Sequence, residues 1–196
     1  MLRNLIRFKE KGSFKGKASK TKWFFRVCLM SVLAGFLTGC AVSIEDYQSS
    51  QPAFKLEEFF EGKLIAWGTF QDRSGKVTRR FKVDMEGSWQ GAKGVLDEDF
   101  IYDDGEKQKR IWYLEKLSEG RYRGTASDVV GEAIGEVEGF ALNWSYDLLV
   151  PVDDTEYQLT FNDWMYLLDE RSVINKASVI KFGIEVGQVT LFIQKQ

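Results

Sequence analysis

From residue 63 to the end of the chain, apolar and polar residues alternate with a period of two. Within residues 77–89, the sequence VTRRFKVDMEGSW places Phe81, Val83 and Met85 on one face and charged residues on the other. The segments 141–150 and 155–163 show the same alternation. This period is typical of antiparallel strands that bury one face. The pattern therefore predicts an all-β domain.

Short turn sequences separate these alternating segments. They occupy residues 72–75, 90–94, 103–106, 118–120 and 151–154. Such close spacing predicts consecutive hairpins with about 9–10 strands in total. Because a meander of long strands removes its two open edges by closing, we expect an antiparallel up-and-down β-barrel rather than a sandwich. The interior of a barrel of this size is either filled by side chains or holds one small ligand.

One helical pattern precedes the strands. Leu56, Phe59 and Phe60 recur at helical spacing, and Gly62 supplies a stop. We therefore expect one short N-terminal helix that closes an end of the barrel. Residues 54–196 are assigned to the barrel domain.

The N-terminal segment has the organisation of an export signal. Basic residues between Lys20 and Arg26 precede an apolar run over residues 27–37, and small residues follow it. The run is too short to span a bilayer, which takes about 20 apolar residues. This order is typical of a secretory signal peptide, which we assign to residues 1–39. An ordinary signal peptide followed by an incidental cysteine is the alternative.

The sequence LTGC at Leu37–Cys40 resembles the lipobox of bacterial lipoproteins. The resemblance implies a diacylglyceryl group on Cys40, cleavage before it and acylation of the new amine. The protein would then be held on the membrane by its acyl chains. Ala41, where Asp would mark retention at the inner membrane, is similar to the pattern of Gram-negative lipoproteins on the periplasmic face of the outer membrane. The polar residues 40–53 are interpreted as a flexible tether.

Charge and composition exclude several classes of function. The chain holds 27 basic and 29 acidic residues, but nine basic residues and a single acid precede Cys40, so the remainder carries about −10. Such a domain repels nucleic acid. It has no histidine and no cysteine after Cys40, which removes Ser-His and Cys-His catalysis and the usual zinc ligands. We therefore expect no catalytic residue, metal or cofactor. The acidic run 97–106 is interpreted as a hairpin with an acidic face, with calcium binding as the alternative.

Long stretches of the sequence carry a family resemblance. They are residues 67–89, 96–116, 122–136 and 162–191. From about Leu56 to the C-terminus the chain resembles DUF3833, a family of bacterial lipoproteins of unknown function. The resemblance implies a lipocalin-like, calycin-type barrel, and Gly87–Trp89 is similar to the G-x-W motif of lipocalins. The association of this family with genes for membrane fatty-acid modification implies a lipid-related role.

Several large or polar side chains are phased with the apolar face and are candidates for ligand binding. Arg110 shares the parity of Trp112, and Tyr102 shares that of Phe100 across the turn. If this parity faces inward, Arg110 lies inside near Tyr102 and an acid. It would then anchor an anionic head group, form an internal salt bridge or cap the core at the end of the barrel. Trp164 and Met165 come instead from the stretch 162–170, where Met and aromatic residues could line a ligand mouth or be ordinary core and edge packing. The full set of candidates is Trp89, Tyr102, Arg110, Trp112, Asp128, Trp144, Tyr146, Trp164 and Met165.

Three functions are compatible with these observations. The leading hypothesis is a lipid-anchored envelope protein whose barrel binds a small hydrophobic or amphipathic ligand, such as a fatty acid or another lipid. The second is a structural scaffold with a filled barrel that binds another protein. The third is a carboxylate-based enzyme acting on a lipid. The first requires a hollow barrel, and the third requires a perturbed acid within it.

Overall fold

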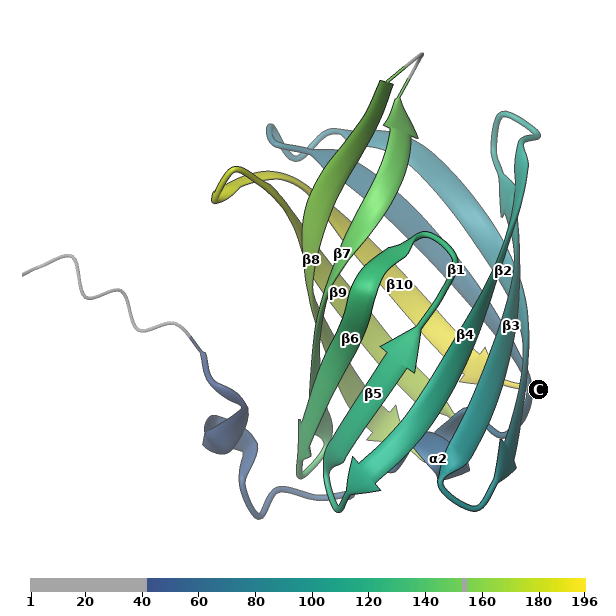
Figure 1. Cartoon of the computed structure of the whole chain (residues 1–196), viewed down its shortest axis with the longest axis vertical. Coiled ribbons are helices and arrows are strands. Elements are labelled where there is room, and N and C mark those ends of the chain that lie inside the picture. The colour runs from purple at the N-terminus through teal and green to yellow at the C-terminus, as the bar shows by residue number, and fades with distance from the viewer. Residues whose placement is uncertain (1–41, 153–154) are drawn as a thin grey trace, which may run out of the picture. The chain divides into compact units, whose positions relative to one another are not determined.

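Ten antiparallel strands form a closed barrel in the computed structural model, which describes residues 42–152 and 155–196 (Figure 1). The strands are β1 (Gly62–Asp72), β2 (Val77–Gln90), β3 (Lys93–Tyr102), β4 (Lys107–Ser118), β5 (Arg121–Thr125), β6 (Val129–Glu138), β7 (Ala141–Val152), β8 (Thr155–Asp169), β9 (Ser172–Lys181) and β10 (Ile184–Lys195). Each pairs with its neighbour in sequence. The predicted all-β, up-and-down barrel of nine or ten strands is confirmed.

The barrel is closed by the pairing of its first strand with its last. β1 and β10 are in register from Leu64 opposite Lys195 to Asp72 opposite Gly187. Along β2 the predicted alternation holds, because Val83 and Met85 are buried inside while Asp84 and Glu86 are exposed outside. The strand period therefore decides which side chains face the interior.

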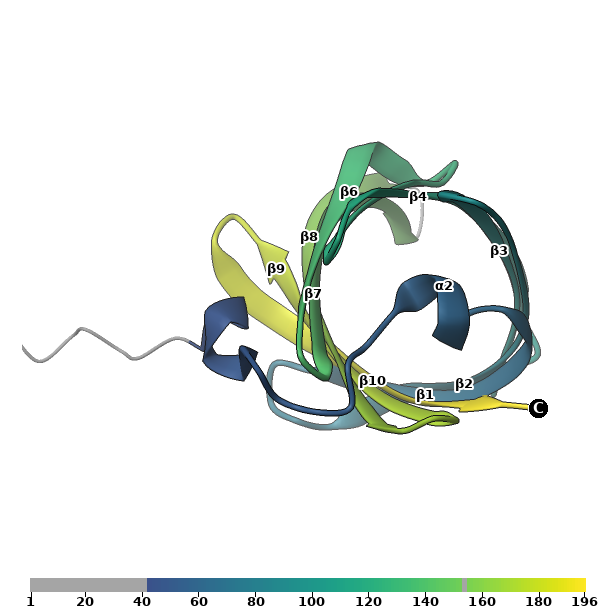
Figure 2. The ribbon, with the colours of Figure 1, turned by 90° about the horizontal axis from the view of Figure 1, so that it is seen from below.

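A short helix closes one end of the barrel, as predicted. The helix α2 (Leu56–Phe59) buries Leu56 and Phe59, and the neighbouring Phe60 is buried as well. Figure 2 shows α2 within the ring of strands. A Cβ atom on Gly87 of β2 would lie 1.6 Å from the carbonyl oxygen of Phe60, so the helix end packs directly on that glycine. The helix forms a floor beneath the interior.

The chain before the helix packs against the outside of the wall. The 3₁₀-helix η1 (Ile44–Tyr47) places Tyr47 on Phe140 and Trp164, with ring centroids 5.3 Å and 5.9 Å apart. The amide of Phe54 donates a hydrogen bond to the carbonyl of Gly139 at 2.7 Å. Part of the segment interpreted as a tether is thus docked on the barrel. The predicted signal peptide and Cys40 lie outside the described residues.

The wall is lower at β5 and β6 than elsewhere (Figure 1). β5 has five residues, and its pairing with β4 extends only as far as Tyr113 opposite Thr125. The pairing of β6 with β7 likewise reaches Leu148. The loop that joins β5 to β6 contains Asp128, and the backbone carbonyl of Asp128 accepts a hydrogen bond from the amide of Leu149. A loop side chain can therefore reach the interior at this level.

No helix in the described part of the chain is long and apolar enough to span a membrane.

Candidate functional site

The interior of the barrel is hollow. A cavity of about 660 Å³ extends from Leu56 and Phe60 on the floor to Arg79, Glu106 and Lys107 at the opposite rim. Its volume lies within the range of about 300–1,000 Å³ that is usual for small-molecule sites. The filled interior that the scaffold hypothesis requires is therefore not found.

Aromatic side chains form one side of the cavity. The Trp112 ring meets Trp144 and Tyr146 edge-on, with centroids 6.0 Å and 5.4 Å apart. Glycines make room for these rings, since a Cβ atom on Gly135 would lie 1.9 Å from Trp144 Cε3. Apolar side chains from the other strands complete the lining: Phe81, Val83, Met85, Phe161, Met165 and Leu191. The cavity is suited to an apolar body that packs against flat rings.

A polar centre lies within this apolar lining, and Arg110 is at its middle. The Arg110 side chain is 15% exposed. Its Nε and Nη2 atoms donate hydrogen bonds of 2.9 Å and 2.7 Å to Asp128 Oδ2. Its Nη1 atom lies 3.9 Å from Glu98 Oε2. Arg110 thus faces carboxylates on both sides, which is the internal salt bridge that the sequence analysis kept as an alternative.

Glu98 and Asp163 are the two strongly perturbed acids of the cavity. Burial raises the pKa of Glu98 to about 7, against the opposing attraction of Arg110. Burial also raises the pKa of Asp163 to about 6, although Asn175 and Tyr146 both donate hydrogen bonds to it. Glu98 Oε2 is buried and has no hydrogen-bond partner among the described residues. Both acids therefore change charge near neutral pH.

These shifts make the stability of the barrel depend on pH. Between the ordinary carboxyl pKa of 4.5 and the folded value of about 7, the folded state holds a proton on Glu98 that the unfolded state has released. Stability is then highest at low pH in this window and falls as pH rises through 7. We expect Glu98 to contribute a loss of about 2–3 kcal/mol between pH 5 and pH 8. Without histidine, the described residues offer few other groups that titrate here.

Urea unfolding followed by tryptophan fluorescence at several pH values measures this effect. Glu98→Gln should remove about half or more of the decline, while Asp163 accounts for the remainder. Asp99→Asn, on the outer face of the same strand, serves as the control and should leave the decline intact. A wild-type protein that is equally stable at pH 5 and pH 8 would contradict the prediction.

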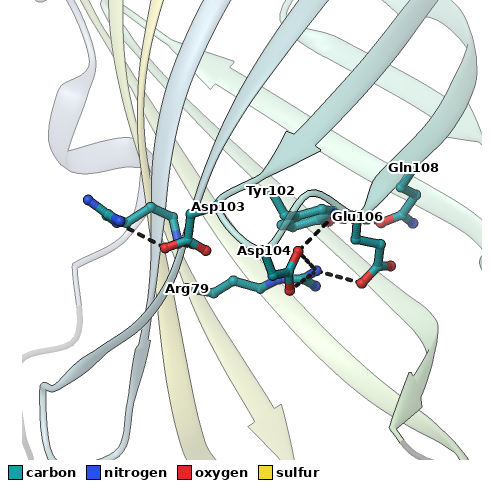
Figure 3. A network of polar contacts seen from close by, with 7 residues as sticks. Arg79, Tyr102, Asp103, Asp104, Glu106 and Gln108 are labelled. Atoms are coloured by element: carbon teal, nitrogen blue, oxygen red, sulfur yellow. Dashed lines mark hydrogen bonds and ion pairs between the residues drawn. The ribbon is translucent and has the colours of Figure 1, made fainter.

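A second polar network lies at the rim of the cavity (Figure 3). The guanidinium carbon of Arg79 stands 3.5 Å over the Tyr102 ring, and Nη2 donates hydrogen bonds to Asp104 Oδ2 at 2.8 Å and to Glu106 at 2.5 Å. The Tyr102 hydroxyl donates to Gln108 Oε1 at 2.8 Å. The acidic run 97–106 is therefore a hairpin, and arginines of β2 neutralise acids of its turn. Among the described residues, no cluster of three or more acids is arranged to hold a metal ion.

Most sequence-predicted candidates line the cavity. They are Tyr102, Arg110, Trp112, Asp128, Trp144, Tyr146 and Met165. Trp89 points inward but lies outside the cavity lining, where its ring covers Gly94. Trp164 lies on the outer face, stacked on Tyr166 and in contact with Tyr47. Neither contributes to the cavity wall, because Trp89 lies at the wrong height and Trp164 has the wrong strand parity.

Sequence reasoning missed Glu98, Asp163 and Asn175. Glu98 stands between Asp97 and Asp99, so the whole run was interpreted as a solvated face. Its parity with Leu96 and Phe100 was the signal that it points inward. Asp163 likewise has the parity of Phe161 and Met165. The alternation that located the aromatic wall would have located these acids too.

Comparisons with known proteins agree with this architecture. A model of the family described as "Protein of unknown function (DUF3833)" matches residues 34–195. Among solved structures, the chain is similar to the S-type phycobiliprotein lyase CPES from Guillardia theta, with a TM-score of 0.50 and 9% sequence identity. That alignment covers 73% of this chain and 94% of the lyase, and it shows a shared fold. A search of curated proteins found no match.

Proposed function

We propose that this chain, which belongs to the DUF3833 family of unknown function, binds a small amphipathic molecule of the lipid class inside the cavity of its barrel. The observation that carries this proposal is the hollow, aromatic-lined interior with a polar centre. Apolar burial there contributes roughly 25 cal/mol per Å² of ligand surface removed from water. The likeness to the phycobiliprotein lyase concerns the fold and adds no ligand.

The proposal includes a location for the protein. The lipobox-like LTGC sequence supports lipidation of Cys40, and Ala41 supports the periplasmic face of the outer membrane. An anchored barrel would take up its ligand close to the bilayer. The membrane would then be both the point of attachment and the source of an apolar ligand.

Native mass spectrometry of the protein extracted in mild detergent tests both parts. The spectrum should show a co-purified lipid-class ligand, and the mass of the chain should include the acyl groups on Cys40. Ala177→Phe, which fills part of the cavity, should remove the ligand, whereas Lys176→Ala on the outer face should retain it. A folded wild-type protein that carries no ligand and takes up none from added lipids would refute the binding function.

A second candidate function is acid–base catalysis on a ligand held in the same cavity. A buried carboxyl group with a pKa of about 7, as in Glu98, is suited to proton transfer at neutral pH. This function predicts a chemically altered product that the wild type forms from its ligand. Glu98→Gln should abolish the product while the ligand still binds. Unaltered ligand after long incubation with the wild type would exclude catalysis on that ligand.

A further inference from the structure

The polar centre of the cavity has an excess of negative groups. Glu98 and Asp128 flank the guanidinium of Arg110, and Asp163 lines the same cavity. Tyr146 and Asn175 add hydrogen-bond donors without charge, and burial raises the pKa of Tyr146 so that its hydroxyl stays protonated. Arg79 and Lys107 belong to the rim, where Arg79 is already paired with acids of the hairpin turn. The centre therefore lacks one or two positive charges.

Asp128 already engages two of the three nitrogens of the Arg110 guanidinium. Asp128 accepts hydrogen bonds from Nε and Nη2, and the Nη1 side faces Glu98. A ligand carboxylate would have to displace Asp128 from Nε and Nη2, or approach Nη1 directly beside the Glu98 carboxylate. Because like charges in a buried site repel strongly, such a ligand would lose much of the affinity that its apolar part provides.

The environment of Glu98 indicates which chemical group a ligand would have to supply to the polar centre. Its side chain is 14% exposed, it lies on the cavity lining, and its Oε2 atom has no hydrogen-bond partner among the described residues. An acceptor left unpaired in a buried site costs about 1–3 kcal/mol. A ligand that donates a hydrogen bond there and also carries positive charge would satisfy the acceptor and balance the charge.

We propose that the barrel selects amphipathic ligands with a protonated amine head group, held among Glu98, Asp128 and Asp163 while the apolar body packs on Trp112 and Trp144. An ammonium group suits this place because it is a compact charge with three donors and no acceptor. This inference rests on the proposed function, since it concerns the head group of a ligand that the barrel binds.

Competition with a neutral fluorescent probe tests the inference. N-phenylnaphthylamine is bound to the full-length protein at pH 8 and displaced by dodecylamine, dodecanol or dodecanoate, each below its micelle concentration. The three share one alkyl chain, so their differences report the head group. We expect dodecylamine to bind at least tenfold more tightly than dodecanol, and dodecanoate to bind most weakly. Glu98→Gln should reduce the amine preference about tenfold, while the outer-face control Asp99→Asn should leave it unchanged.

The rank order of the wild type alone decides the inference, even if a variant fails to fold. If dodecanoate binds most tightly, or the three bind equally, the amine selection is wrong and the ligand-binding function stands. If neither the probe nor any of the three amphiphiles binds the folded protein, the proposed function itself fails.

Discussion

Replacing Arg110 by methionine is expected to lower the free energy of unfolding by about 3–5 kcal/mol at pH 8. Methionine fills much of the volume but leaves Asp128 and Glu98 in the cavity without their positive partner. Removing one member of a buried ion pair costs this much because the remaining charge has lost its water and gained nothing in return. Chemical unfolding of the purified barrel measures the effect.

The same variant should recover part of its stability in acid. Because Arg110 lowers the pKa of Glu98 and of Asp163, these two groups bind protons more readily without it, so the deficit should shrink between pH 8 and pH 5. Arg123→Met is the matched control, because Arg123 pairs with Glu115 and Glu132 on the outer face and such exposed pairs contribute about 0–1 kcal/mol. If Arg110→Met cost no more than this control, the centre would not depend on its ion pair.

Replacing Phe59 by alanine should destabilise the barrel by about 3–5 kcal/mol. Phe59 is 4% exposed and meets Phe54 and Phe60 edge-on, with centroids 5.7 Å and 5.0 Å apart. Its removal leaves a void beneath the cavity floor, which neighbouring strands held by continuous ladders cannot close. Urea unfolding of the variant provides the measurement.

Glu58→Ala, in the same helix, separates floor packing from helix formation. The Glu58 side chain is 68% exposed and pairs with Lys55, so its loss should change stability by less than about 0.5 kcal/mol. Equal effects of the two substitutions would mean that the helix covers the barrel without supporting it. A loss of ligand binding in Phe59→Ala with little change in stability would point to the same conclusion.

The fold could be predicted from local sequence patterns because the alternation, the turn sequences and the helical spacing all indicate the same architecture. Alternation gives the strands, short turns give the hairpins, and the helical spacing of Leu56 and Phe59 gives the floor. In a meander only one strand pair joins segments distant in the sequence, here β1 and β10. This pair is expected to form because unpaired edge strands favour aggregation. For these reasons the strand number, the closure and the short helix were all predicted.

The site was predicted only in part, because alternation decides the face of a strand and not the height at which a side chain lies. Trp89 has the correct parity but belongs to the floor end of β2. Trp164 was grouped with Met165 as part of one Met- and aromatic-rich stretch, although neighbouring residues of a strand point to opposite faces. The partner of Arg110 depends on a still less local feature. Asp128 reaches it because β5 ends after five residues and the following loop turns inward.

β1 gains its second partner only when β10, the last strand of the chain, joins the sheet. As long as residues 184–195 have not joined the sheet, β1 and β9 each present a row of unsatisfied amides and carbonyls. Such rows readily recruit strands from other molecules. A chain truncated before this segment would keep both rows permanently, so its expected fate is self-association rather than a smaller barrel.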